Sequence, residues 1–200
     1  MQFLFGSIIC LLLAASGNAL VCEVCSSIGT SCTGSLQICE ADEDTCVIVV
    51  SENSLAGDII HTIAKSCTNS SLCKQEPKYM NLGQGKIIRS SMICCVGDAC
   101  RTAVPQIPPI IQTNGKQCPA CYALSDSGCN DRERVNCVGP ENSCLDLAMT
   151  ITYGTHVLNT FQRGCVSKSA CDELKTGETE MQGVRTVVKK AECKAPSSSS

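Results

Sequence analysis

The sequence predicts an all-β, disulfide-rich protein that is built from two tandem domains. Three observations carry this prediction: a very high cysteine content, an internal repeat in the cysteine spacing, and short β-branched runs between the cysteines. The chain has 200 residues, which is enough for two small domains. Together these features indicate a scaffold that depends on covalent cross-links more than on one large apolar core.

A secretory leader is expected at residues 1–19. Phe3–Ala15 is uncharged and mostly apolar, and Gly17 and Ala19 place small residues at the −3 and −1 positions of a cleavage site. The apolar run is shorter than a membrane-spanning helix requires. We therefore expect a secreted chain that starts at Leu20 and folds in an oxidising compartment.

The cysteine count agrees with that compartment. Of the 19 cysteines, Cys10 lies in the leader, which leaves an even number in the mature chain. The sequence has no Trp, and few aromatic rings remain after the leader: Tyr79, Tyr122, Tyr153 and Phe161. Because aromatic side chains supply much of an ordinary core, we expect disulfides, each worth about 3 kcal/mol for a long loop, to replace that burial.

Charge and the composition of the C-terminal segment argue against nucleic-acid binding and against a lipid anchor. The formal net charge is −3, and no basic run follows a pattern suited to a phosphate backbone, so nucleic acid is not expected. The residues after Cys193 are polar and small, whereas a lipid-anchor signal needs an apolar tail. We therefore expect a product without a membrane anchor.

The cysteines form two clusters with nearly the same spacing. Successive steps are 3, 7, 7, 7, 21, 6 and 21 residues in the first cluster and 3, 8, 8, 7, 21, 6 and 22 in the second. This agreement indicates an internal duplication with a period near 96 residues, in which each unit has its own cross-links and can fold alone. We predict a first domain at 20–101, a linker at 102–116, a second domain at 117–194 and a Ser-rich tail at 195–200.

Strands are expected in the long gaps between cysteines. Cys46–Val50 and Ile59–Ile63 are apolar and β-branched, and they predict a hairpin in the first unit. Leu145–Thr152 alternates with a period of two, and His156–Phe161 returns after a turn, so a matching hairpin is expected in the second unit. The next gap and the short first loop of each unit predict two further hairpins.

The linker is rich in proline and isoleucine. Pro105, Pro108 and Pro109 exclude a helix or an inner strand, so the segment is expected to be extended and semi-rigid. Its apolar residues make it either a spacer or a contact surface, since a stiff strip loses little entropy on binding. The candidate partner-binding residues are Pro105, Ile107, Pro108, Pro109, Ile110 and Ile111.

Hairpins that project from a cysteine knot opened by Cys-x-x-Cys resemble the three-finger (snake-toxin-like) domain of the urokinase-receptor and lymphocyte-antigen-6 family. Spacing alone leaves the disulfide pairing open. The resemblance implies, for the first unit, the pairs Cys22–Cys46, Cys25–Cys32, Cys39–Cys67, Cys73–Cys94 and Cys95–Cys100. For the second unit it implies the pairs Cys118–Cys144, Cys121–Cys129, Cys137–Cys165 and Cys171–Cys193.

The chain departs from the family pattern at two places. Arg101 stands where the family usually has Asn after its last cysteine, and the second unit lacks the final cysteine pair and the closing cysteine. Four cross-links still hold each knot. We therefore expect the fold to be kept and the C-terminal tail to be looser.

Further motifs lie at Lys65–Lys74, Ile93–Cys95, Asn114–Gly115 with Cys118–Pro119, Gly164–Ser167 with Cys171–Leu174, and Ala191–Cys193. With these motifs, the two-unit arrangement is similar to the gamma-type phospholipase A2 inhibitors of vertebrate serum. The resemblance implies a secreted, non-enzymatic protein that binds a secreted phospholipase A2, and it also implies homo-oligomers. Amphibian courtship pheromones of the sodefrin-precursor-like group look similar, so a secreted signal remains the alternative.

The Cys-x-x-Cys pairs and the two histidines are candidates for a metal site or a catalytic site. The two Cys-x-x-Cys pairs could hold zinc, but all their cysteines fit the repeat, and no metal or cofactor is predicted. His61 and His156 occupy similar places near the sixth cysteine of each unit and lack a nucleophile beside them, so no catalytic site is predicted.

Two polar motifs are expected at the surface, an acidic run and a glycosylation acceptor. Asp42–Asp44 could bind calcium, but a solvated acidic turn is the expectation. Asn69 begins an Asn-Ser-Ser acceptor, which predicts N-glycosylation in a secreted chain.

Overall fold

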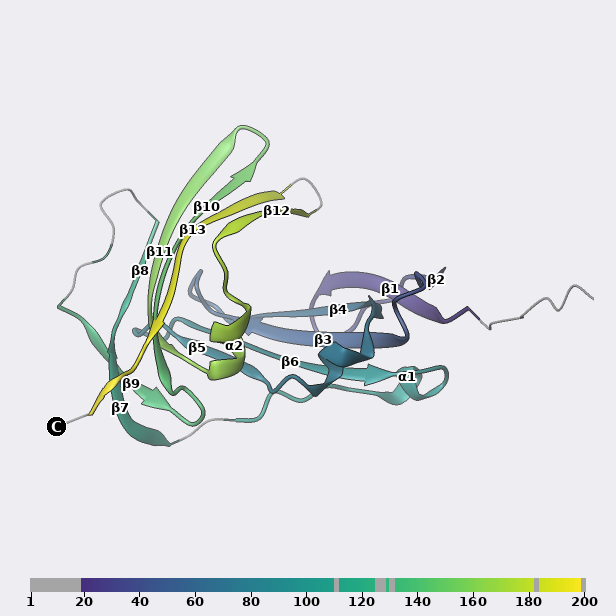
Figure 1. Ribbon diagram of the computed structural model, residues 1–200, viewed down its shortest axis with the longest axis horizontal. Helices are drawn as coiled ribbons and strands as arrows, with labels where there is room; N and C mark the ends of the chain where they lie inside the picture. Colours follow the sequence, from purple (N-terminus) through teal and green to yellow (C-terminus); the bar gives the residue numbers. More distant parts are fainter. Residues whose placement is uncertain (1–18, 110–111, 125–128, 130–131, 182–183, 199–200) are drawn as a thin grey trace, which may run out of the picture.

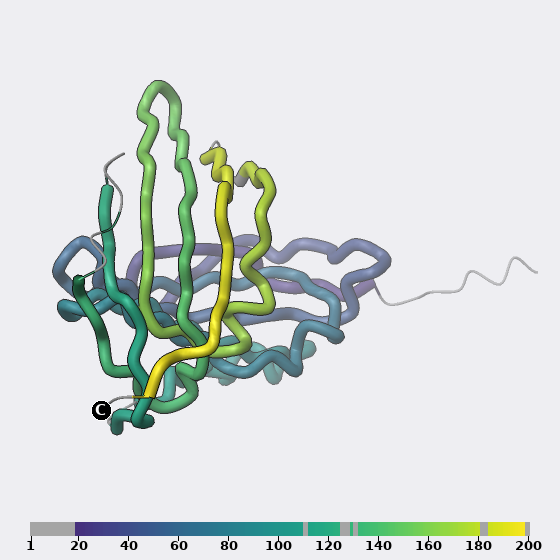
Figure 2. Tube along the Cα trace, turned by 60° about the vertical axis from the view of Figure 1, so that its left-hand side comes forward, coloured from purple at the N-terminus to yellow at the C-terminus, as the bar shows by residue number. Residues whose placement is uncertain are grey.

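The strands of the two units form two arms that meet at one end (Figure 1). The computed structural model describes residues 19–109, 112–124, 129, 132–181 and 184–198. The predicted leader at 1–19 therefore lies outside the described residues except for its last position. In Figure 2 the long hairpins of the second unit stand side by side and rise across the direction of the first unit's strands.

The first unit contains six strands and two short helical segments in its described residues. The strands are β1 (Val21–Ile28), β2 (Ser35–Ile38), β3 (Thr45–Asn53), β4 (Ile60–Thr68), β5 (Lys78–Asn81) and β6 (Ile87–Cys95). The 3₁₀ segment η1 (Ser70–Lys74) and the helix α1 (Ala99–Thr102) follow β4 and β6. Hairpins β1–β2, β3–β4 and β5–β6 are antiparallel, as the cysteine gaps predict.

The second unit repeats this plan with one change. Its elements are β7 (Thr113–Pro119), β8 (Cys121–Ala123), β9 (Arg134–Val138), β10 (Ser143–Tyr153), β11 (His156–Val166), α2 (Lys168–Glu173), β12 (Gly177–Met181), β13 (Val184–Lys194) and β14 (Ser197–Ser198). In the first unit β1 pairs with both β2 and β4. In the second unit the equivalent strand is divided at Ala120, so that β7 pairs with β9 and β8 pairs with β11.

The C-terminal tail differs from its expectation. A looser tail is predicted because the second unit lacks the closing cysteine. In the described residues, however, β14 pairs with β7 through Ser197 opposite Gln117 and Ser198 opposite Lys116. The backbone of the Ser-rich segment therefore finds strand hydrogen bonds where the first unit uses a disulfide.

Among the described strands, eleven form one continuous sheet that runs through both units. Its order is β12–β13–β10–β11–β5–β6–β3–β4–β1–β2, with β8 beside β11. The two units join where β11 pairs antiparallel with β5, through Val166 opposite Met80 and Cys165 opposite Asn81. The domains are therefore one sheet bent at this junction rather than two separate sandwiches.

Nine disulfides hold the two knots in the described part of the chain. They join Cys22–Cys46, Cys25–Cys32, Cys39–Cys67, Cys73–Cys94, Cys95–Cys100, Cys118–Cys144, Cys121–Cys129, Cys137–Cys165 and Cys171–Cys193. In each knot two disulfides pack against each other. The Sγ atoms of Cys22 and Cys39 lie 3.2 Å apart, and those of Cys118 and Cys137 lie 3.5 Å apart. Sulfur thus fills space that aromatic rings fill in other domains.

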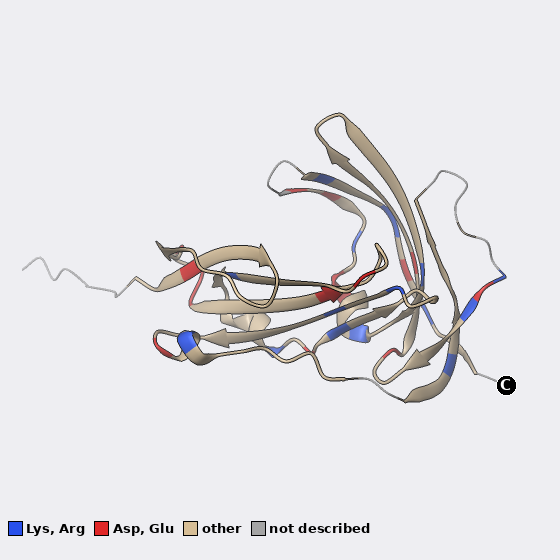
Figure 3. Cartoon of the chain, turned by 180° about the vertical axis from the view of Figure 1, so that it is seen from behind, with Lys and Arg blue, Asp and Glu red and all other residues tan. Residues whose placement is uncertain are grey.

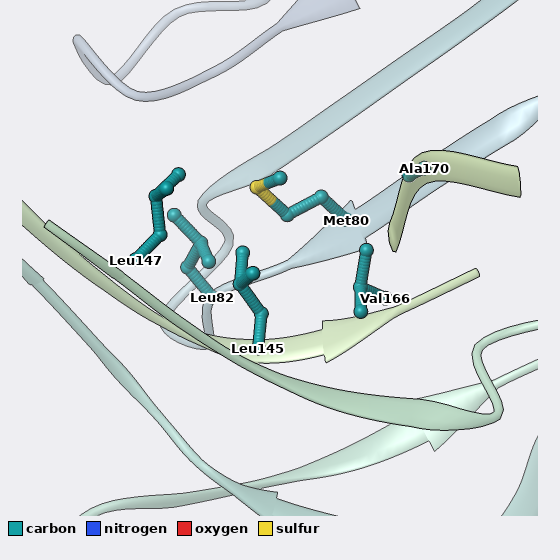
Figure 4. Close-up of a cluster of buried hydrophobic side chains, with 6 residues drawn as sticks. All are labelled: Met80, Leu82, Leu145, Leu147, Val166 and Ala170. Atoms are coloured by element: carbon teal, nitrogen blue, oxygen red, sulfur yellow. The ribbon is translucent and has the colours of Figure 1, made fainter. Parts of the chain in front are cut away.

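The apolar core at the junction is shared by both units (Figure 4). Met80 and Leu82 come from the first unit, and they pack against buried residues of the second: Leu145, Leu147, Val166 and Ala170. The cluster limited to the second unit consists of Cys118, Cys137 and Cys165. Each disulfide joins two cysteines of the same unit, as the repeat predicts. This apolar core, by contrast, needs side chains from both units.

Ser167 reinforces the junction with hydrogen bonds. Its backbone N–H donates to the Tyr79 carbonyl at 2.9 Å, and its Oγ accepts from the Tyr79 N–H at 3.0 Å. Ser169 Oγ donates to the Pro77 carbonyl at 2.9 Å. Ser167 is also the N-cap of α2, because its Oγ accepts from the Ala170 N–H. One buried hydroxyl therefore both starts α2 and fastens it to the first unit.

Gly164 provides a test of the junction. A Cβ at this position would overlap the Asn81 carbonyl oxygen and would lie 2.8 Å from Leu82 Cα. We expect Gly164→Ala to separate β11 from β5 and to lower stability by about 1–3 kcal/mol, measured as the thermal unfolding midpoint of the secreted chain. Thr152→Ala, on the same hairpin but away from β5, is the control. An unchanged midpoint for Gly164→Ala would contradict the strand pairing.

Glu141 is a buried carboxylic acid beside the junction, with 3% of its surface exposed. Burial raises its pKa to about 7, although its carboxylate accepts from the Val138 N–H at 2.9 Å and is favoured by the Asn81 side chain and the Arg89 charge. Asn114 Nδ2 donates to the backbone carbonyls of Glu141 and Gly139, each at 3.0 Å. The acid is therefore held between the second unit and two strands of the first, β5 and β6.

This burial predicts a pH dependence. The folded pKa lies above the unfolded value of 4.5, so the folded state holds more protons and stability falls as pH rises from about 4.5 to about 7. We expect Glu141→Gln, which is neutral at every pH, to gain up to about 3 kcal/mol over the wild type above pH 7 and little at pH 4.5. Urea unfolding at both pH values measures the difference. An equal effect at the two pH values would be the contrary result.

Candidate functional site: the uncharged inner face of the sheet

Strand alternation and register define one face of the sheet that runs across both units. Successive side chains on a strand point to opposite faces, and paired residues share a face. Because Val166 pairs with Met80, the face of the second unit that carries Val166 continues into the face of the first unit that carries Met80. We call this the inner face, because the shared core lies on it in the angle between the arms.

The register assigns residues to the inner face on each arm. On the first unit these are Ile28, Val49, Ser51, Ile60, Thr62, Ala64, Ile88, Ser90 and Met92. On the second unit they are Met149, Ile151, Tyr153, His156, Leu158, Thr160, Val184, Thr186 and Val188. Nearly all of these side chains are apolar or carry a hydroxyl group.

Side-chain contacts agree with this assignment. Ser51 and Thr62, both inner, share a hydrogen bond of 2.6 Å between their hydroxyls. Glu52, one residue further along β3, lies on the outer face, with its carboxylate 2.6 Å from Arg89 Nη2 and 3.9 Å from His61 Nδ1. These polar contacts therefore join residues of the same face, as the alternation of side chains along each strand predicts.

On the paired strands β10, β11, β12 and β13 of the second unit, charged side chains lie on the outer face. There Asp146 Oδ2 lies 2.8 Å from Lys190 Nζ and 3.3 Å from Arg163 Nη2, and Arg185 pairs with Glu178. At the inner positions that the structure describes, Lys78 is the one Asp, Glu, Lys or Arg, and its Nζ lies 2.5 Å from Glu173 Oε2. Figure 3 shows that the upper part of the β10–β11 hairpin has no charged residue.

Several inner side chains are open to solvent. Ile28 is 81% exposed, Tyr153 63%, Leu158 40% and Ile60 38%. Single exposed apolar residues are ordinary, but a group of them on one face without charges is typical of an interaction surface. The inner face can therefore gain free energy by burial without first stripping water from charged groups.

The linker lies on the opposite, outer face of the first unit. Ala103 packs against the core of that unit, Pro105 is buried, and Ile107 is half-buried. A pocket of about 250 Å³ is lined by linker residues together with Val50, Glu52 and His61 of the outer face, and with their strand neighbours Ser51 and Thr62. Of the other predicted contact residues, Pro108 and Pro109 are exposed, whereas Ile110 and Ile111 lie outside the described residues. The first part of the linker thus covers the first unit's own sheet.

This packing gives the linker a structural role that can be measured. We expect Ile107→Ser to lower stability by about 1 kcal/mol, because it removes the apolar burial of a half-buried isoleucine side chain. Val104→Ser is the matched control, since Val104 is 66% exposed and its substitution should change little. Urea midpoints compare the two variants. Equal midpoints would show that the linker does not stabilise the first unit.

The acidic turn and the glycosylation acceptor contact each other. Asp44 accepts hydrogen bonds from the Ser70 N–H at 2.6 Å and Oγ at 2.7 Å, and these lower the pKa of its carboxyl. Asn69 is exposed; its Oδ1 accepts from the Ser71 N–H, and its Nδ2 donates to the Asp42 carbonyl. The acidic residues therefore hold the end of β4 and η1 to the preceding loop.

The cysteine and histidine positions do not assemble a reactive site in the described residues. Two groups of three sulfurs lie close enough together to hold an ion, Cys22–Cys39–Cys67 and Cys118–Cys137–Cys165. All six sulfurs are in disulfides, so none is a thiolate ligand. His61 lies on the outer face and His156 on the inner face, so their similar places in sequence do not correspond in the fold.

Sequence reasoning missed the inner face as a surface. A signal was present, because residues 147–162 contain no Asp, Glu, Lys or Arg and alternate between apolar and polar residues in the first strand. That pattern indicates a strand with two different faces. It does not say which face of the first unit joins which face of the second, because this depends on the pairing of β5 with β11.

The fold and this surface define a class of protein: a tandem three-finger protein, with hairpins projecting from disulfide knots and no helix among the described residues long and apolar enough to cross a membrane. Comparison of the sequence with protein families agrees. Residues 20–102 match the Phospholipase A2 inhibitor family model, and residues 114–199 match the u-PAR/Ly-6 domain model. The chain belongs to the gamma-type phospholipase A2 inhibitor family, which confirms the resemblance inferred from its motifs.

Curated relatives cover most of the chain. A phospholipase A2 inhibitor gamma subunit of Gloydius brevicaudus siniticus is 33% identical over 167 residues, 80% of each chain. Phospholipase A2 inhibitor NAI of Notechis ater is 31% identical over 78% of each chain, and Phospholipase A2 inhibitor CgMIP-I of Cerrophidion godmani is 31% identical over 93% of each. Among solved structures, mouse TEX101 is 18% identical, with a TM-score of 0.35 over 89% of this chain and 99% of that one.

Proposed function

We propose that this protein is secreted, binds a secreted phospholipase A2 and inhibits it by protein–protein contact, with no catalytic step of its own. The observation that carries the proposal is family membership: relatives named phospholipase A2 inhibitors are 31–33% identical over most of the chain. The alternative from the sequence, a secreted signal on the same scaffold, has no observation of this kind in its favour.

The architecture supports a binding role. Nine disulfides cross-link the described part of the chain, and the junction between the units is packed and hydrogen-bonded. A scaffold that is already ordered loses little conformational entropy when a partner docks, so more of the contact energy appears as affinity. The projecting hairpins present apolar side chains from this support.

The mode of inhibition follows from the chemistry of the enzyme. A phospholipase that hydrolyses aggregated lipid has to place an apolar surface against the lipid layer. A protein that covers this surface prevents the enzyme from reaching its substrate without entering the active site. We therefore propose inhibition by covering the lipid-facing surface of the enzyme. The linker residues predicted as contacts from the sequence, Pro105 and Ile107–Ile111, are one candidate surface for this contact, and Pro108 and Pro109 are their exposed members among those described.

Two further features remain proposals. Asn69 is proposed to carry an N-linked glycan, because its side chain is exposed and one Nδ2 hydrogen bond leaves room for attachment. The homo-oligomers implied by the family resemblance are proposed as well. Neither is required for the contact with the enzyme described above.

The direct test is inhibition by the secreted protein. The full chain is expressed in a secreting cell line, and the purified product is added to a panel of acidic and basic secreted phospholipases A2 while hydrolysis of phospholipid vesicles is followed. We expect saturable binding to at least one enzyme together with loss of hydrolysis. Protein whose disulfides have been reduced and alkylated is the control and should not inhibit.

The contrary outcome is equally informative. If the folded product binds none of the enzymes and leaves hydrolysis unchanged, the inhibitor proposal is wrong, and the secreted-signal alternative takes its place. Circular dichroism of the same sample, with its strand content intact, is needed to show that a missing effect is not a missing fold.

A further inference from the structure

We propose that the phospholipase docks against the inner face, between the two arms, rather than against the linker. The inference rests on the proposed function and specifies the surface and the chemistry of the contact. The inner face would receive the uncharged, apolar, lipid-facing surface of the enzyme. The outer face, with its ion pairs and the packed linker, would remain in water.

Charge is the first reason. The inner positions of the described strands carry no unpaired charge, whereas the outer face carries several ion pairs. An apolar partner surface gains free energy in proportion to the apolar area that is buried on such a face. A charged partner surface would lose its hydration there and find no opposite charge, which is costly. The inner face therefore selects an uncharged partner surface.

The nature of the exposed side chains is the second reason. Tyr153 and Leu158 stand near the tip of the β10–β11 hairpin, and Ile28 and Ile60 stand on the first arm. Tyrosine is among the residues that are enriched at the energetic anchors of protein contacts, and exposed leucine and isoleucine add apolar area to be buried. The hydroxyls of Thr62 and Thr186 add hydrogen-bonding groups between these anchors. Both arms thus offer contact groups to a single partner.

Size is the third reason. Nine residues of β3 span about 30 Å and eleven residues of β10 span about 36 Å, at 3.3 Å per residue. A length of 30 Å is close to the diameter of a small globular domain. Figures 1 and 2 show the arms running in different directions from the junction, so the two halves of the inner face lie at an angle to each other. This suits a folded enzyme better than a single acyl chain or an extended peptide.

The junction keeps this surface in place before the partner arrives. Met80 and Val166 are buried in the shared core, and Ser167 hydrogen-bonds across to Tyr79. The angle between the arms is therefore set by packing at their base. The linker lies on the other face of the first arm, beside His61 and Glu52. An enzyme seated on the inner face would not touch the linker's packed segment, which separates the two possible sites experimentally.

A matched pair of variants tests the inner face. Tyr153 and Val157 are each 63% exposed and lie on the same hairpin. Tyr153 belongs to the inner face, whereas Val157, paired with Thr152, belongs to the outer face. We expect Tyr153→Ser to weaken inhibition of vesicle hydrolysis about tenfold or more, as loss of an interface anchor does, and Val157→Ser to change it less than about twofold. Ile28→Ser tests the first arm and should also weaken inhibition.

The outcomes separate the two levels of the proposal. No inhibition by the folded wild type overturns the proposed function and the assigned partner with it. Wild-type inhibition that survives both Tyr153→Ser and Ile28→Ser overturns the inner face as the docking surface. Loss of inhibition with Val157→Ser, or with Pro108→Ser and Pro109→Ser, would then place the contact on the outer face or on the linker. Thermal unfolding of each variant shows that the hairpin is still folded.

A control without enzyme tests whether the inner face binds the lipid layer itself. The wild type and Tyr153→Ser are sedimented with the same phospholipid vesicles in the absence of enzyme. We expect neither protein to co-sediment. If the wild type does and the Tyr153→Ser protein does not, the inner face binds the lipid layer itself, and the proposal that it seats the enzyme is overturned.

Discussion

A strand contact of two residue pairs decides which face of each unit belongs to the inner face. Met80 and Asn81 of β5 pair with Val166 and Cys165 of β11, and this pairing makes one sheet out of two repeated units. Because paired residues share a face, it also decides which side of each unit turns inward. The shared core, the close approach of Gly164 to Asn81 and the hydrogen bonds of Ser167 all gather around this contact.

Covalent and noncovalent forces have different tasks in this fold. The disulfides hold the base of each set of hairpins, where their sulfur atoms pack in place of the scarce aromatic rings. Apolar side chains, by contrast, are concentrated at the junction, where Leu82 meets Leu145 and Leu147. Cross-links act within a unit by restricting its unfolded chain, whereas packing acts between units. The fixed angle between the arms therefore comes from packing rather than from a cross-link.

The separation of charge between the two faces connects the fold with the proposed activity. On β10 and β13, charged residues point outward and apolar residues point inward, even where the inner residues are open to solvent. An exposed apolar face risks aggregation unless a partner uses it. The proposed function supplies such a partner class, an enzyme that acts on lipid. The linker, although more apolar in sequence, partly serves to cover its own domain.

The all-β class, the duplication and the family follow from the sequence alone, because cysteine spacing and two-residue alternation are local patterns. The hairpins around Val50 and Tyr153 follow from the same patterns. Cysteine spacing by itself left the disulfide pairs open, and the composition of the linker could not show whether Ile107 faces a partner or its own sheet. Tertiary structure decided those points, together with the pairing of β5 with β11 and hence the inner face. These contacts join residues far apart in the chain, and no local pattern in the sequence encodes the register between them.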